Sequence, residues 1–118
     1  HIINHGEIKV SSLSEVRIEA FINSSSTGII TVESNGILDI ARGGSISQID
    51  ACGSVVINGT SRIYKELSLN ISKLHGTCST NSLYMIHAKL EDKPSAFYIE
   101  SMNNTQLTMI NSTLVLGS

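Results

Sequence analysis

The feature that most constrains this sequence is a glycine that recurs at short and nearly even intervals between residues 28 and 57. Successive glycines lie 8, 8 and 9 residues apart, and each begins a short run rich in β-branched residues. The four runs are Gly28-Ile-Ile-Thr-Val, Gly36-Ile-Leu-Asp-Ile, Gly44-Ser-Ile-Ser-Gln-Ile and Gly53-Ser-Val-Val-Ile. β-Branched residues favour strands and glycine tolerates sharp corners. The repeat therefore predicts short strands that follow one another around tight corners.

Such a pattern is typical of a β-solenoid, in which each turn of the chain stacks on the turn before it. No stretch combines a helical period with a helix start and stop signal, and about a dozen short strands are expected. Three strands of about eight residues make a coil of roughly 24, so the 118 residues predict about five coils. We expect residues 1–118 to form one all-β domain that belongs to a longer chain. A β-sandwich gives similar strand spacing and is the alternative fold.

The composition argues against several classes of function. Only 15% of the residues are charged, the formal net charge is −2, and the basic residues are spread along the chain. We therefore expect no nucleic-acid partner, because such a partner needs a basic patch. The apolar runs are too short for a transmembrane segment. The sequence carries no recognisable catalytic, metal-binding or cofactor motif, so we expect a protein without a cofactor and without enzymatic activity.

Two sets of charged residues are candidates for a ligand-binding face. Asp39 and Asp50 deserve consideration because β-helical carbohydrate-active enzymes use carboxylates that project from stacked strands. Arg17, Arg42 and Arg62 are 25 and 20 residues apart, close to one coil, and would stack as a ladder able to bind acidic sugars. A carbohydrate-binding or carbohydrate-active protein is the alternative function that these residues suggest. The alternative interpretation is that all five keep the outer faces solvated.

Cys52 and Cys78 are separated by 26 residues, which is about one coil. Stacked positions of adjacent coils place β-carbons about 5 Å apart, slightly beyond the usual disulfide range. We therefore expect two buried free thiols, with a disulfide as the alternative. Five Asn-x-Ser/Thr triplets also keep open a glycosylated β-sandwich ectodomain; they begin at Asn23, Asn58, Asn70, Asn103 and Asn111.

The two ends of the predicted solenoid are apolar. The ends of any solenoid are unpaired sheet edges, which must be capped, covered or paired with another copy. We expect self-association, or association with a protein partner, through residues at both ends. These are Ile2 and Ile3 at one end and Leu114, Val115 and Leu116 at the other.

Residues from Gly53 to Leu90 carry a resemblance to known β-helical repeats. They include Ser-Val-Val-Ile-Asn-Gly-Thr-Ser-Arg-Ile after Gly53 and Glu-Leu-Ser-Leu-Asn-Ile-Ser-Lys-Leu-His-Gly further on. This stretch is similar to the repeat of bacterial putative auto-transporter adhesins, the head-GIN domain, and more distantly to bactofilins. Asn58-Gly59 stands where that family's repeat has Ser-Gly. The resemblance implies a structural or interaction module at the cell surface or outside the cytoplasm, with a cytoplasmic filament as the alternative.

Overall fold

The computed structural model describes residues 2–24, 27–59, 67–78, 81–86, 88–91, 105–110 and 112–115. These residues form short strands and contain no helix, and every strand pair is parallel. The predicted β-solenoid is therefore confirmed. The strands are β1 (Ile2–Asn4), β2 (Glu7–Val10), β3 (Glu15–Ile18), β4 (Ile22–Ser24), β5 (Ile29–Val32), β6 (Ile37–Ile40), β7 (Gly44–Ala51), β8 (Ser54–Asn58), β9 (Leu67–Gly76), β10 (Asn81–Ile86), β11 (Ala88–Glu91), β12 (Thr105–Ile110) and β13 (Thr113–Val115).

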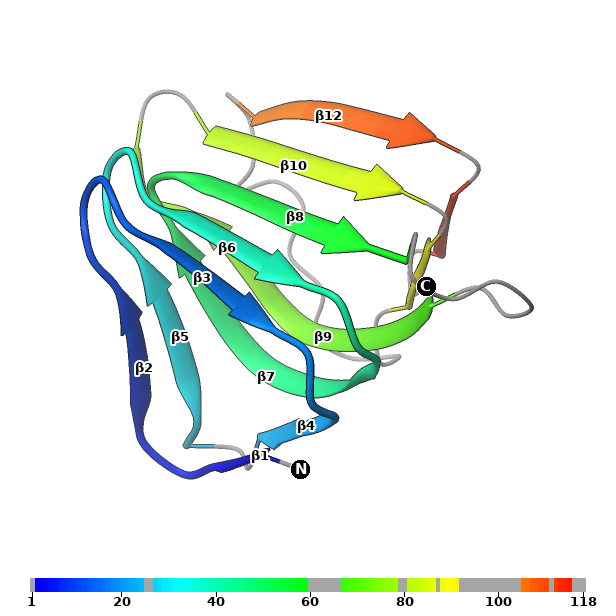
Figure 1. Cartoon of the computed structure of the whole chain (residues 1–118), viewed down its shortest axis with the longest axis horizontal. Helices are drawn as coiled ribbons and strands as arrows, with labels where there is room; N and C mark the ends of the chain where they lie inside the picture. Colours follow the sequence, from blue (N-terminus) through cyan, green and yellow to red (C-terminus); the bar gives the residue numbers. More distant parts are fainter. Residues whose placement is uncertain are drawn as a thin grey trace.

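The strands line three walls around one core (Figure 1). The first wall contains β1, β4, the first half of β7, the first half of β9, β11 and β13. The second wall contains β2, β5 and the second halves of β7 and β9. The third wall is a separate sheet in the order β3, β6, β8, β10 and β12.

Equivalent positions on successive turns lie 20 to 25 residues apart, as the first wall shows with Ile2, Ile22, Gly44, Leu69, Leu90 and Leu114. The solenoid makes about three turns, fewer than the five coils expected from length. In the described residues, the second wall ends at β9. Beyond β9, the described residues extend the first and third walls alone.

The core consists of side chains stacked in columns, one from each turn. In the third wall, Leu38 stacks on Val55 and Leu83, and Ile40 stacks on Ile57 and Met85. These six side chains are at most 4% exposed. In a parallel stack each inward residue lies over its equivalent, so one alternating pattern repeated on each turn creates a continuous core.

The corners depend on glycine at specific places. Gly44 has a φ of 145°, and a Cβ on it would collide with the backbone of Ile22 on the previous turn. A Cβ on Gly53 would likewise meet the backbone of Gly36. Glycine therefore allows successive turns to approach closely at these corners.

The corner between the second and third walls has a left-handed residue in each of the first two turns. Leu13 has a φ of 63° and Asn35 a φ of 62°. Each is the third residue of a four-residue turn closed by a backbone hydrogen bond, from Ser14 to Ser11 and from Gly36 to Glu33. Asparagine tolerates this conformation, whereas leucine does so at a cost of about 1 kcal/mol or more.

Leu13→Asn should stabilise the protein by about 0.5–1 kcal/mol, because it places at this corner the residue type that the next turn already uses. Leu13 is 86% exposed, so little apolar burial is lost. The midpoint of urea unfolding measures the gain. Leu13→Ala keeps the β-carbon and serves as the control, and an equal gain in both variants would contradict the explanation by backbone strain.

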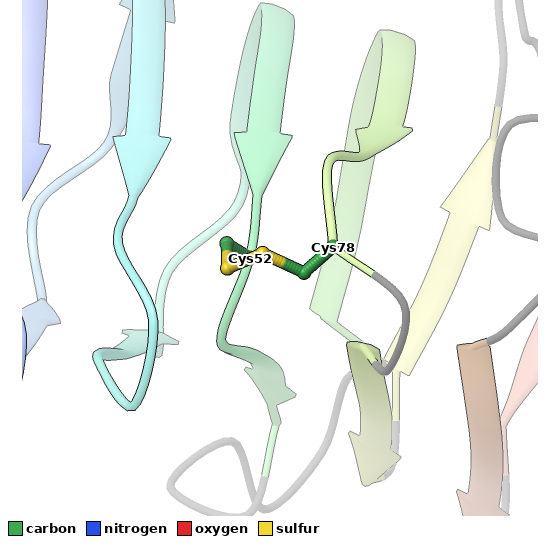
Figure 2. Close-up of a disulfide and its surroundings, with 2 residues drawn as sticks. All are labelled: Cys52 and Cys78. Atoms are coloured by element: carbon green, nitrogen blue, oxygen red, sulfur yellow. A yellow bond between two sulfur atoms is a disulfide. The ribbon is translucent and has the colours of Figure 1, made fainter.

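Cys52 and Cys78 form a disulfide that joins two neighbouring turns (Figure 2). The prediction of two buried free thiols is therefore wrong. Thr77 donates its N–H to the carbonyl of Ala51, so Cys78 lies one residue beyond the position stacked on Cys52. This offset at a corner gives a Cα separation of 4.8 Å, well within disulfide range. Cys52 is half-buried and Cys78 exposed, so both lie outside the core.

Replacement of both cysteines by serine should lower the free energy of unfolding by about 3.5 kcal/mol, the loop-entropy value for a sequence separation of 26 residues. Urea unfolding of the native protein and of the Cys52→Ser/Cys78→Ser variant measures the difference. Alkylation followed by mass spectrometry checks the bond directly. Labelling of either cysteine in the folded protein without a reductant would contradict the assignment.

The sequence also predicts one strand over residues 83–90, further strands at 62–64 and 96–100, and an exposed loop around Pro94. The strand expected over residues 83–90 is present as two strands, β10 and β11, which lie on different walls. Asn58-Gly59, a tight-turn signal, lies at the end of β8 and forms no hairpin, because β8 pairs in parallel with β6 and β10. The strands expected at 62–64 and 96–100 and the Pro94 loop lie outside the described residues.

Candidate functional site

The structure does not bring the two candidate carboxylates together. Asp39 lies on β6 in the third wall, where its register neighbours are Arg17 and Val56. Asp50 lies on β7 in the second wall, between Thr31 and His75. The two residues belong to different sheets. A glycoside-cleaving pair requires two carboxylates on one face, so this arrangement does not provide the site that the sequence suggested.

Asp50 belongs to a network that ties strands of the second wall together. The side-chain amide of Gln48 donates a hydrogen bond to Oδ1 of Asp50 at 2.9 Å, and Nδ1 of His75 lies 3.6 Å from the same oxygen. One turn earlier, the Thr31 hydroxyl donates to Oε2 of Glu7 at 2.7 Å. Cross-strand polar pairs of this kind support a sheet by a fraction of a kcal/mol each. The outer face of the second wall is therefore a polar surface of mixed charge.

Asp39 is the one buried charged side chain among the described residues, at 7% exposure. Nη1 of Arg17 lies 3.6 Å from its Oδ2, while its Oδ1 is buried without a hydrogen-bond donor. Nε of Arg17 also lies 2.8 Å from Oε1 of Glu19. Among the described residues, Arg17 is the one cation close to this carboxylate, which is almost removed from water, so Asp39 depends on it.

The expected arginine ladder is not formed by the arginines that the structure describes. Arg17 lies on β3 and is in register with Asp39. Arg42 is exposed in the corner after β6 and lies two residues past Ile40, the last residue of that strand. Arg62 lies outside the described residues.

Among the described residues, no group of three or more His, Cys, Asp and Glu side chains is close enough to hold a metal ion. In these ranges there is also no helix of the length and apolarity needed to cross a membrane.

The residues predicted for the N-terminal end differ in exposure. Ile2 on β1 is partly buried against the core, whereas Ile3 is 62% exposed. At the other end, Leu114 and Val115 are on β13, the last strand of the first wall; their side chains and all of Leu116 lie outside what the structure describes.

The most unusual surface is β12, which among the described strands forms a free edge of the third wall (Figure 1). Leu107 and Met109 continue the two core columns, yet they are 46% and 38% exposed. Leu83 and Met85, directly below them, are 4% and 0% exposed. Ile110 adds a third apolar side chain, 43% exposed. The residue pattern predicts a strand over residues 106–110 but does not place it at an end of the solenoid. The signal is that Thr105–Ile110 is uncharged and that its apolar residues alternate in phase with the core.

Comparison with protein-family models, curated proteins and solved structures found no match to this chain. The resemblance to the putative auto-transporter adhesins and to bactofilins therefore stays a prediction. The candidate site therefore has to be inferred from the geometry of the chain itself. The geometry indicates the β12 edge, because side-chain columns that are buried elsewhere in the core become exposed at this strand.

The Arg17–Asp39 pair can be tested by a double-mutant cycle. Arg17→Met should lower the free energy of unfolding by about 1–3 kcal/mol, because it leaves a buried carboxylate without its cation. Asp39→Val matches the neighbouring Val56 and should be neutral or stabilising, and the double variant should recover the loss. Denaturant unfolding measures all four proteins. Equal midpoints for Arg17→Met and the double variant would contradict this explanation, because the unpaired carboxylate of Asp39 would then carry no cost.

Proposed function

We propose that this chain is a non-enzymatic structural and interaction module that associates through an open end of its solenoid. One observation carries the proposal: the core columns end at β12 with Leu107 and Met109 46% and 38% exposed. On the neighbouring strand β10, the equivalent side chains Leu83 and Met85 are buried. At this end of the third wall, the described strands therefore leave core-facing side chains without a further layer to cover them.

The physical basis is that an edge strand carries two unsatisfied demands. Among the described strands, none pairs with its outward N–H and C=O groups, and none adds a layer over its core-facing side chains. A further strand at this edge would satisfy both at once, since burial stabilises by about 25 cal/mol for each Å² of apolar surface. Charged residues normally protect such edges, and Thr105–Ile110 has none.

The disulfide supports a location for the proposed function. Cys52–Cys78 joins neighbouring turns at an exposed corner, where thiol reagents have access. Disulfides of this kind persist in oxidising compartments. Together with the flat polar second wall, this favours a structural or adhesive role at the cell surface or outside the cytoplasm.

The test is the oligomeric state of the purified protein, measured by light scattering at low and high concentration. The wild-type molar mass should rise with concentration. Met109→Lys should abolish the rise, because a charge at the edge opposes pairing. Leu13→Lys replaces another exposed apolar side chain, in a corner remote from β12, and should associate as the wild type does. Folded wild-type protein that stays monomeric at every concentration would contradict association of the chain with itself through this end.

A further inference from the structure

We propose that the occupant of the β12 edge is a second copy of this chain, joined tail to tail by antiparallel pairing of the two β12 strands around Thr108. This inference rests on the proposed function and specifies its partner. It follows from three properties of β12: which backbone groups are free, which side chains face the core, and how charge is distributed between the two edges of the third wall.

The free backbone groups of β12 follow from the hydrogen bonds of β10. Ser82 donates its N–H to the carbonyl of Gly53, and the carbonyl of Ile86 accepts from the N–H of Gly59. The even-numbered residues of β10 therefore direct their backbone N–H and C=O groups toward β8. The odd-numbered residues of β10 direct their backbone groups toward β12, and of these Leu83 is in register with Leu107. In a parallel pair, the residues flanking Leu107 return these bonds. Leu107 and Met109 therefore direct their own N–H and C=O groups to the free edge.

The same two residues face the core, and this makes the edge complementary to itself. Residues directly opposite in an antiparallel pair point to the same face. With the two-fold axis at Thr108, Leu107 lies opposite the second copy's Met109, and Met109 lies opposite the second copy's Leu107. Both pairs are hydrogen-bonded and both cover the exposed columns above Leu83 and Met85. On the outer face, Thr108 meets the second copy's Thr108, a favourable cross-strand pair.

The opposite edge of the third wall does not offer an equal surface for head-to-tail stacking. β3 carries Glu15 and Arg17 and is followed by Glu19, and all three side chains are exposed. The core-facing side chain of β3, Ile18, is already buried, with 4% of its surface exposed. Charge on an edge strand opposes pairing, so β3 is protected where β12 is not. A two-fold contact uses the same unprotected surface twice and closes at the dimer.

The dimer should be weak. β12 contributes six residues from each copy, compared with about 20–30 residues on each side of a standard stable interface. We therefore expect an equilibrium that depends on protein concentration, with the dimer as its upper limit.

Thr108→Cys tests the two-fold axis directly. A non-hydrogen-bonded antiparallel pair has a Cα separation of about 4.5 Å, within disulfide range. Mild oxidation at high concentration should convert Thr108→Cys to a covalent dimer on a non-reducing gel, with the Cys52–Cys78 bond retained on peptide mapping. Ser82→Cys is the matched control, since Ser82 lies on the same outer face one strand away from the edge and should remain monomeric on the gel.

The outcomes separate this inference from the proposed function. A Thr108→Cys dimer, together with wild-type mass that stops rising at the dimer, supports the tail-to-tail arrangement. Assemblies that grow beyond the dimer without a Thr108→Cys bond would overturn it and leave association through the ends standing. Monomer at every concentration and no covalent dimer would overturn both.

Discussion

The structure depends on one constraint, the parallel stacking of equivalent residues from turn to turn. Leu38, Val55 and Leu83 occupy one column of the third wall, and Ile40, Ile57 and Met85 occupy the next. Because side chains alternate between the two faces of a strand, a shift of one residue would turn a whole column to solvent. The corners must therefore deliver each strand in register. Gly44 and Gly53 allow this because their lack of a side chain lets backbones of adjacent turns approach closely. Stability then comes mainly from contacts between neighbouring turns, as in other repeat architectures.

The glycine spacing allowed the fold to be predicted from the sequence, because it equals the number of residues from one wall to the next. Gly28, Gly36 and Gly44 precede or begin β5, β6 and β7, one on each wall. The spacing did not reveal which strand joins which wall. β7 crosses from the first wall to the second at Ser47 without a glycine, and Cys52-Gly53 turns the corner with only two residues. These irregularities shift the register by amounts that local residue patterns do not specify.

The candidate site was harder to predict for the same reason. Asp39 and Asp50 both occupy outward positions 11 residues apart, but β7 carries the chain around two walls between them, so they lie on different sheets. The separation of Cys52 and Cys78 correctly indicated neighbouring turns. It did not indicate the bond, because Cys78 lies one residue past the stacked position and only the shape of the corner brings the two Cα atoms to 4.8 Å. Side-chain patterns determine which face a residue occupies; corner geometry determines which residues meet.

The ends of the solenoid express the same constraint in reverse. Within a column, the turns above and below each side chain help to bury it, and the end member lacks one of these neighbours. At β3 the chain compensates with charge, which keeps the edge solvated and opposes pairing. At β12 it has the uncharged segment Thr105–Ile110, with its core-facing residues and its free backbone groups at the same positions. In a solenoid, where each turn contacts only its neighbours, this difference makes the two edges of the third wall unequal. At the unprotected β12 edge, burial of more apolar surface can still stabilise the molecule.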